Sequence, residues 1–496
     1  MKLYKYLTIL FAGSMLMTSC GDDFFNDMDS STATGEQVSS ESKNNPQKVL
    51  LSQLNGCYST WNTSIPSNAS DIIAHQEAGF GAIMTVSDIM SNDISLPLGS
   101  GDPFHFDHVF DYNAESYVRC AWFWDIFYSI IKSSNEVIQV VNENDMSTEQ
   151  KHYLGQALAF RGICYAYLAQ FYQKTYKGNE DKLCVPIYLT TRENEAGKPN
   201  IAGRATVQQV YDQVESDLTK AISYLDGYKR SDKTFIDKQV AEGFLARVYL
   251  VMNKWAEAAQ MAHDARQGYS LNNMDEATAW NYQDASNKEV MWAFVPTDAT
   301  KLFYASWASW HSYDSPGYVS IYHQLIDKAL YNSIPNNDVR KTLYVSDEEA
   351  TDAVPAGVSK KFPFVAQWLG NVVYMRASEM YLIEAEASFK AGNTQQTADV
   401  MAEFMPNRVA NWTAPTSYTA AYIYNQRRIE LWGEGFGYFD CLRLKQPLVR
   451  DYEGTNENAA TQVNIPADSY KWIFQIPKSE IRDNDNITEA DQNPVK

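Results

Sequence analysis

The sequence predicts a mostly α-helical protein in which tetratricopeptide-like helix pairs form a scaffold, accompanied by long irregular loops and a few short strands. Three observations predict this class. Apolar residues recur at helical spacing over several long stretches, and one of these stretches matches the offsets of a tetratricopeptide helix pair. Segments rich in Gly and Pro, without periodicity, separate the helical stretches. We expect one helical domain over residues 48–496 of the 496-residue chain.

The N-terminus predicts a leader over residues 1–19. Lys2 and Lys5 precede an apolar run from Leu7 to Met17, which is too short to cross a bilayer, and the tetrapeptide MTSC ends at Cys20. This pattern resembles a bacterial lipoprotein leader, which implies cleavage before Cys20 and acylation of that cysteine. An ordinary secretory signal with a chance cysteine is the alternative. Residues 20–47 are rich in Asp, Ser and Asn, and we expect them to form a flexible tether.

Charge and cysteine usage narrow the possible functions. The net charge is −20, and the absence of a long basic run argues against nucleic-acid binding. Besides Cys20 there are five widely spaced cysteines without a C-x-x-C pair, and Cys164 lies in an apolar helical stripe. This usage indicates small buried hydrophobic residues rather than a disulfide framework or a zinc site.

Residues 147–172 predict the central helix of the fold. Two apolar stripes run side by side along it, so most of its circumference is expected to be covered. Ser147 and Gln150 fit a capping box at its start. Arg161 occupies a position in the second stripe where an apolar residue is due. We interpret Arg161 as a buried strut paired with carboxylates.

Other elements follow from the same patterns. Helices are predicted over residues 49–58, 82–90, 116–141 and, after a capping box of Thr206 and Gln209, 206–225. The tetratricopeptide-like pattern covers residues 246–265, with a weaker copy at 373–401. Repeat-like helix pairs are therefore expected around residues 147–172, 206–268 and 371–404. Residues 183–189 and 289–296 read as short extended runs.

Several of these segments together resemble a known family. AFRGICYAYLAQFY, RVYLVMNKWAEAAQMA, RRIELWGEGFGYFDCLRLK and QIPKSEIRDNDNIT occur in this order. They resemble the SusD/RagB family of outer-membrane nutrient-binding lipoproteins from Bacteroidota, over nearly the whole chain. The resemblance implies a loop-rich ligand face around residues 61–115 and 280–370. It also implies a position over a TonB-dependent barrel, to which a captured oligosaccharide is passed. Gly437 departs from the family pattern E-G-x-R-x-x-D, which puts in doubt a salt bridge in the C-terminal core.

The residue types of two irregular regions suit a sugar ligand. Sugars present weakly apolar faces to aromatic rings and hydroxyls to polar side chains. The candidate ligand-binding residues are Asp88, Asn92, Trp307, Trp310, His311, Tyr313 and Tyr318. A tryptophan in a long loop can instead pin that loop to the core, and some of these residues could meet the barrel partner.

Catalytic and metal-binding patterns are weak. His105 and His108 have a spacing that could ligate a metal, but no H-E-x-x-H frame surrounds them, so we interpret them as loop histidines. No catalytic residue, metal or cofactor is predicted. We expect a lipid-anchored protein on the outer surface of the outer membrane that captures oligosaccharides without being an enzyme. The alternatives are a peptide-binding protein of the same architecture, a lipid-anchored glycoside hydrolase, and a helical scaffold without a small ligand.

Overall fold

The computed structural model describes residues 46–65, 75–191 and 201–495. The predicted leader, Cys20 and nearly all of the predicted tether lie outside the described residues. The helices used below are α3 (Pro46–Thr63), α5 (Gly79–Ile89), α6 (His105–His108), α7 (Val118–Val140), α8 (Thr148–Tyr172), α9 (Val207–Tyr224), α10 (Lys238–Met252), α11 (Trp255–Ala265), α12 (Met274–Ala279), α13 (Trp307–His311), α14 (Lys328–Ser333), α15 (Ala377–Lys390), α16 (Thr394–Phe404), α17 (Ala420–Leu431), α18 (Gly437–Arg443) and α19 (Lys478–Asp483).

Helix α8 lies at the centre of the helical part and packs against α3, α7 and α9. Its residues from Leu154 to Tyr172 are buried, with Gln170 only partly so. The capping box predicted for Ser147 and Gln150 is present. Arg161 donates to both carboxylate oxygens of Asp217, at 2.8 and 2.7 Å. The predicted helix and its buried strut are thus confirmed.

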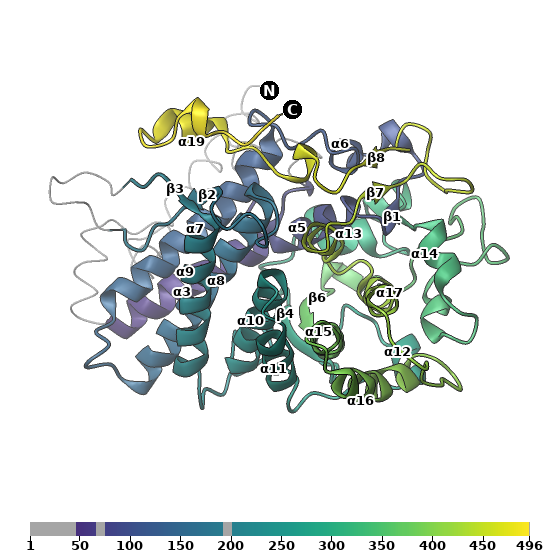
Figure 1. Ribbon diagram of the computed structural model, residues 1–496, viewed down its shortest axis with the longest axis horizontal. Coiled ribbons are helices and arrows are strands. Elements are labelled where there is room, and N and C mark those ends of the chain that lie inside the picture. The colour runs from purple at the N-terminus through teal and green to yellow at the C-terminus, as the bar shows by residue number, and fades with distance from the viewer. Residues whose placement is uncertain (1–45, 66–74, 192–200, 496) are drawn as a thin grey trace, which may run out of the picture.

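The tetratricopeptide-like pattern also forms the predicted helix pair. Helices α10 and α11 pack together, and Asn253 adopts a left-handed conformation in the turn between them. Three alanines of α11, Ala258, Ala262 and Ala265, are buried, which lets neighbouring helices approach closely. Helix α11 also contacts α15, which pairs with α16. Figure 1 shows these pairs following α8 and α9 across the molecule.

The strands are short and form two-stranded antiparallel sheets. They are β1 (Ile94–Ser95) with β5 (Leu325–Ile326), β2 (Leu183–Pro186) with β3 (Arg204–Thr206), β4 (Val290–Phe294) with β6 (Val372–Arg376), and β7 (Leu448–Val449) with β8 (Asn464–Ile465). Both predicted extended runs contain a strand. Strand β4 is buried along its whole length, and its pairing with β6 connects the ends of a long loop-rich segment.

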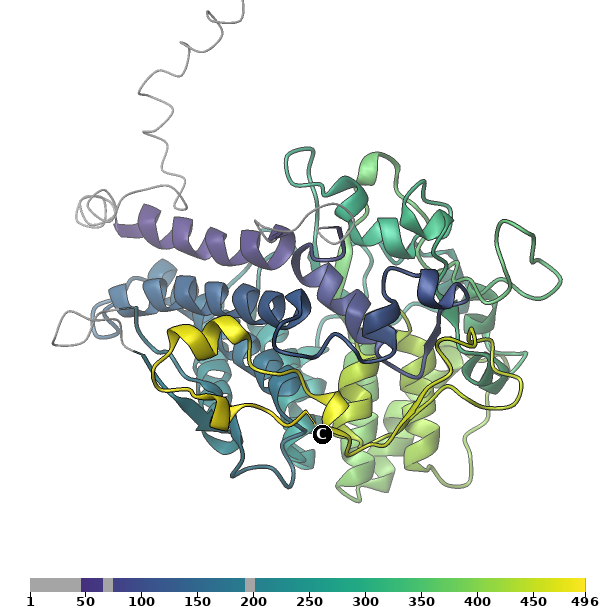
Figure 2. The ribbon, with the colours of Figure 1, turned by 90° about the horizontal axis from the view of Figure 1, so that it is seen from above.

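The C-terminal segment returns to the start of the helical array. The Phe474 N–H donates to the Phe171 carbonyl at 2.7 Å, and the side chain of Asn493 donates to the Tyr172 carbonyl at 2.6 Å. Figures 1 and 2 show this yellow segment lying over α7 and α8. The residues after 471 are therefore part of the fold.

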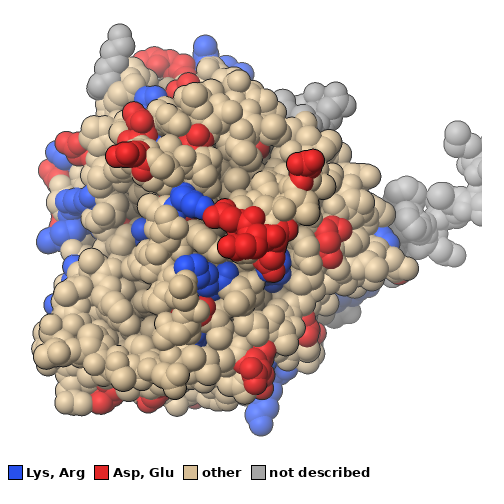
Figure 3. All heavy atoms as spheres, turned by 90° about the vertical axis from the view of Figure 1, so that its right-hand side faces the viewer, with Lys and Arg blue, Asp and Glu red and all other residues tan. Residues whose placement is uncertain are grey.

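The face beside α14 is mostly uncharged. Figure 3 shows one gathering of acidic side chains there, with basic ones beside it. In the loop after α14, Asp347 pairs with Lys328 at 3.4 Å and Glu349 pairs with Lys360 at 2.9 Å, so two of the acids in this region have basic partners.

Two further sequence predictions concern membranes and cysteines. Among the described residues, no helix combines the length and apolar character needed to span a bilayer. The five cysteines in the described part of the chain are free and buried, as predicted.

Candidate functional site

Trp307 and Trp310, two of the predicted ligand contacts, lie on the short helix α13. Ser306 caps this short helix by accepting the Ser309 N–H. Trp307, Trp310 and His311 are spaced by three and four residues, so they share one face, and α13 packs against α5. Gly81 on α5 faces this helix, and an added Cβ there would lie in ordinary contact with Trp307 Cβ, at 3.5 Å.

This packing buries residues that were expected to face a ligand. Trp307 is 7 % exposed and Trp310 is 1 % exposed. His311 is also buried, and its Nε2 lies 2.8 Å from the hydroxyl of Thr85 on α5. The prediction that these three side chains form an exposed binding surface is wrong, because the apolar face of α13 turns inward.

Asp88 and Asn92 are also engaged within the fold. The carboxylate of Asp88 is buried and accepts the N–H groups of Gly435 and Gly437, at 2.7 and 2.9 Å. Burial raises the pKa of Asp88 to about 7, although these two N–H groups oppose the rise. The half-buried Asn92 bonds through its side chain to Pro447 and Val449. The prediction of Asp88 as a ligand contact is wrong, and Asn92 serves to hold β7 in place.

The structure also explains why Gly437 stands where the family pattern has an arginine. A Cβ at this position would overlap the side chain of Ser91, so this backbone leaves no room for an arginine. Asp440, three residues later, instead pairs with Arg427 at 2.7 Å and Arg443 at 2.8 Å. The C-terminal core therefore keeps ion pairs around Asp440 without an arginine at position 437.

The candidate functional site is a surface row of rings, which we name the aromatic strip. It consists of Tyr304, Tyr318, Tyr322, Phe364 and Trp368. Successive ring centres lie 6.3 Å apart for Tyr322 and Tyr318, 5.9 Å for Tyr318 and Tyr304, 5.2 Å for Tyr304 and Trp368, and 5.0 Å for Trp368 and Phe364. Tyr304 is 48 % exposed, and the other four rings are half-buried. The strip therefore offers solvent one exposed ring and four partly exposed rings that contact one another in a row.

Two loops meet to form the strip, and polar contacts hold them together. The exposed Asp314 accepts the Phe364 N–H at 2.7 Å, which joins the loop of residues 303–322 to that of residues 362–370. Trp310 stacks beneath Tyr318 with ring centres 4.4 Å apart, and the Tyr318 hydroxyl lies 2.7 Å from Nδ1 of His75. The buried tryptophan thus fixes the plane of a ring in the strip.

The backbone under the strip is strained. Phe303, Gln367 and Trp368 have backbone φ values of 50°, 61° and 64°, which residues other than glycine rarely adopt. Such conformations cost free energy and cluster at binding and catalytic sites. Here they occur next to Tyr304 and at Trp368, on both segments that form the strip.

Of the predicted ligand contacts, Tyr318 belongs to the strip. Tyr313 is half-buried and packs against the small cluster of Leu325, Val345 and Val358, and its role with a ligand stays a prediction. Sequence reasoning missed Tyr304, Tyr322, Phe364 and Trp368. Tyr304 and Tyr322 stood in the same aromatic-rich segment, whereas Phe364 and Trp368 joined the site only through the meeting of the two loops.

Of the two histidines, His108 is held inside the fold. His108 is buried, with Nδ1 2.8 Å from the Ile89 carbonyl and Nε2 2.9 Å from Glu457. It lies on α6 rather than in a loop, which corrects the predicted location. Within the described ranges, no group of three His, Cys, Asp or Glu side chains could hold a metal ion.

Comparisons with known proteins agree with this architecture. A SusD-like family model described as starch-binding and associating with the outer membrane matches residues 100–250, and the SusD family model matches residues 365–495. No curated protein matches the chain.

Solved structures share the fold over nearly the whole chain. A SusD-like carbohydrate binding protein from Bacteroides vulgatus is 24 % identical, with a TM-score of 0.75 over 91 % of this chain and 98 % of its own. A SusD superfamily protein from Bacteroides thetaiotaomicron is 22 % identical, with a TM-score of 0.74 over 90 % and 99 %. Surface glycan-binding protein A from Bacteroides fluxus is 17 % identical, with a TM-score of 0.66 over 90 % and 99 %.

The solved structures show the fold, and the family models show the family. The first family model is described as starch-binding, and two of the solved proteins are described as carbohydrate- or glycan-binding. Two models of one family match separate regions of the chain, and their order agrees with the resemblance found in the sequence. The chain belongs to the SusD/RagB family, whose members are associated with the outer membrane.

Proposed function

We propose that this protein captures oligosaccharides at the aromatic strip. The observation that carries the proposal is the row of five connected rings, of which Tyr304 is the most exposed. Aromatic faces provide contact area for the apolar side of a sugar ring, and nearby polar groups orient its hydroxyls. Exposed Asp314 and Gln367 border the strip and supply such groups. Tyr313 and Tyr318 remain candidate ligand contacts within this proposal.

The binding experiment uses purified protein and a panel of polysaccharides in native affinity gels. Retarded migration identifies a bound glycan, and calorimetry with oligosaccharides from that glycan gives the affinity. Tyr304→Ala and Trp368→Ala should each weaken binding about fivefold, because one aromatic contact contributes roughly 1 kcal/mol. Tyr117→Ala is the matched control, since this tyrosine is 43 % exposed and lies outside the strip.

The same experiment separates capture from hydrolysis. Release of reducing ends during incubation would contradict the proposal and indicate a glycoside hydrolase. Equal affinities of the Tyr304→Ala, Trp368→Ala and Tyr117→Ala variants would place the binding site elsewhere on the molecule.

The proposal includes an acylated Cys20, an outward-facing position on the outer membrane and delivery of the glycan to a TonB-dependent transporter. The lipoprotein-like leader and the family's association with the outer membrane support this part. Cys20→Ala should move the protein from the membrane fraction to the soluble fraction of cells. Loss of glycan uptake in cells carrying Trp368→Ala, with the transporter present at its usual level, would connect the strip to delivery.

A further inference from the structure

A second site lies where the helical scaffold meets the C-terminal helices. A partly open cavity of about 50 Å³ is lined by side chains of α8, α9 and α10 on one side and of α17, α18 and the turn between these two on the other. It shares no residue with the aromatic strip. One buried water needs roughly 10–15 Å³, so this cavity has room for a small organic group.

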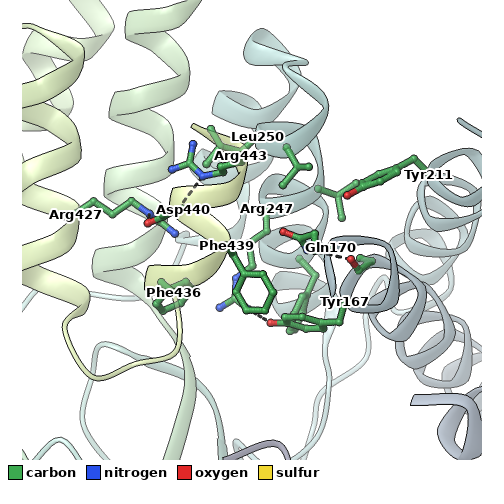
Figure 4. Close-up of a pocket in the computed structure, with 14 residues that line it drawn as sticks. Tyr167, Gln170, Tyr211, Arg247, Leu250, Arg427, Phe436, Phe439, Asp440 and Arg443 are labelled. Carbon is green, nitrogen blue, oxygen red and sulfur yellow. Dashed lines mark hydrogen bonds and ion pairs between the residues drawn. The ribbon is translucent and has the colours of Figure 1, made fainter. Parts of the chain in front are cut away.

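The lining of the cavity is unusually rich in arginine. Arg247, Arg427 and Arg443 line it, and Asp440 is the one acidic residue among the lining side chains (Figure 4). Arg247 has its own partner in Glu379, at 2.6 Å, and Arg443 has Glu386, at 2.5 Å. Both of these glutamates lie outside the lining, so cationic groups outnumber anionic ones on the cavity wall.

Arg427 differs from the other two arginines because its one carboxylate partner, Asp440, is shared with Arg443, whereas Arg443 and Arg247 each also pair with a glutamate. Figure 4 shows Asp440 between Arg427 and Arg443, and each guanidinium bonds a different oxygen of it. Arg427 is 3 % exposed, and its buried Nη1 has no hydrogen-bond partner in the described structure. An unpaired donor on a buried charged group costs free energy, and a ligand acceptor would recover it.

The rest of the wall is apolar and aromatic. Tyr167 and Phe439 face the cavity together with Val248, Leu250 and Val251. Phe436 lies against the guanidinium groups of Arg247 and Arg427, at 5.0 and 5.1 Å from its ring centre. This stacking holds both planar groups in place. Arg247 also donates to Glu379, Tyr167 and Tyr374, so the available donor is Nη1 of Arg427.

We propose that this cavity binds a carboxylate that carries a short branched apolar group. The carboxylate would accept from Arg427, since guanidinium and carboxylate match in geometry and charge. The apolar group would contact the aromatic and aliphatic wall. A free short-chain acid and the C-terminal residue of a peptide both have this chemistry, so the test includes a probe for each.

The test is calorimetry on the full chain with 3-methylbutanoate, N-acetyl-L-valine and the neutral isostere 3-methylbutanamide. At least one carboxylate should bind saturably, and the amide should bind at least about tenfold more weakly, because a hydrogen bond to a charged group contributes about 1.5 kcal/mol or more. Tighter binding of 3-methylbutanoate would identify a free acid as the ligand type. Tighter binding of N-acetyl-L-valine would identify a peptide terminus.

Two variants test the location of the site. Arg427→Gln removes the charge but leaves Asp440 paired with Arg443, and it should weaken carboxylate binding about tenfold. Ala166→Leu adds side-chain volume from α8 into the cavity and should block binding while Arg427 is kept. Arg482→Gln is the control, since this exposed arginine lies far along the chain on α19.

Far-UV circular dichroism and thermal unfolding establish whether each variant is folded. If Arg427→Gln does not fold, Ala166→Leu decides the question alone. Equal binding of acid and amide, absence of binding by both acids, or full binding by folded Ala166→Leu would overturn the proposal.

Discussion

At the scale of single residues, burial determines the chemistry of His311. Its imidazole is enclosed between α13 and α5, stacks on Trp307 with ring centres 4.3 Å apart and contacts the Thr85 hydroxyl. Burial lowers the pKa of His311 from 6.5 to about 3. The ring is therefore neutral in the folded protein at any pH well above 3.

This shift predicts an acid-dependent loss of stability. Between pH 6.5 and 3 the unfolded chain binds a proton at His311 and the folded chain does not, so lowering the pH favours unfolding. At pH 5 this costs roughly 2 kcal/mol, at 1.36 kcal/mol for each pH unit below 6.5. The His311→Gln variant has no imidazole at this position and therefore lacks this pH-dependent loss of stability. Urea unfolding at pH 7.5 and 5.0 should therefore show the stability of wild type falling by about 2 kcal/mol relative to the variant.

Wild type and variant share all other titratable groups, so the difference between their free energies of unfolding isolates the contribution of His311. If the stability difference between wild type and His311→Gln were the same at both pH values, the imidazole would be free to take up a proton in the folded state.

Which aromatic side chains face outward could not be predicted from residue type. Trp310 and Tyr304 stand six residues apart in one aromatic-rich segment, yet one lies in the core and the other at the surface. Exposure is decided by α13, which is too short to give a clear periodic signal, and by the loop of residues 362–370, which is distant in sequence. The spacing of Trp307, Trp310 and His311 was the one local sign of a common buried face.

At the scale of elements, α8 and α9 owe their close packing to glycine. A Cβ added at Gly155 of α8 would lie 2.8 Å from Leu225 Cγ, and one at Gly162 would lie 3.1 Å from Leu218 Cγ. The same approach brings Arg161 within reach of Asp217. Glycine normally weakens a helix interior, so its presence at these two positions reflects the packing of α9.

Gly155→Val should therefore destabilise the protein. The added side chain has to displace Leu225, and overpacking of this kind costs about 2 kcal/mol. Chemical unfolding measures the loss. Gly101→Val is the control, because a Cβ there meets no atom within 4 Å and should change stability little. A Gly155→Val protein as stable as the control would mean that α8 and α9 separate easily.

Much of the helical framework could be predicted because its signals are local. Capping boxes at Ser147 and Thr206 and the small-residue pattern around Trp255 each depend on a few neighbouring residues, and the structure confirms all three. The strip and the arginine-lined cavity depend on contacts between distant segments. Phe364 meets Asp314, and Arg427 comes to line one cavity with residues of α8 and α10, only after distant parts of the chain have folded together.

At the scale of the whole molecule, a buried charge network connects the C-terminal half. Four cations, Lys361, Arg340, Arg376 and Arg408, are paired with four anions, Asp338, Glu289, Glu430 and Glu434. They come from segments between residues 289 and 434, and all are buried. Since the charges balance, the network avoids the large cost of an unpaired buried ion.

Glu430 is the centre of this network and gives the strongest stability prediction. Its carboxylate contacts Arg376 at 2.7 Å, Arg408 at 3.0 Å and Arg340 at 3.2 Å. Burial alone would raise the pKa of Glu430, but the three guanidinium groups hold it well below its ordinary value. Glu430→Gln keeps the shape of the side chain and leaves one positive charge unbalanced, so it should cost about 3–5 kcal/mol in urea unfolding at pH 7.

The pH dependence of this loss distinguishes a charge effect from a packing effect. Because the folded pKa of Glu430 is depressed, its contribution is complete above the ordinary pKa of 4.5 and declines as the pH falls further. The stability gap between wild type and Glu430→Gln should therefore be constant from pH 8 to 5 and narrow in more acidic solution. Arg482→Gln, at an exposed pair with Asp483, should show no comparable gap. A gap that stays constant down to the acid unfolding of wild type would mean that Glu430 contributes through its shape, and that the network does not hold the C-terminal half together by charge.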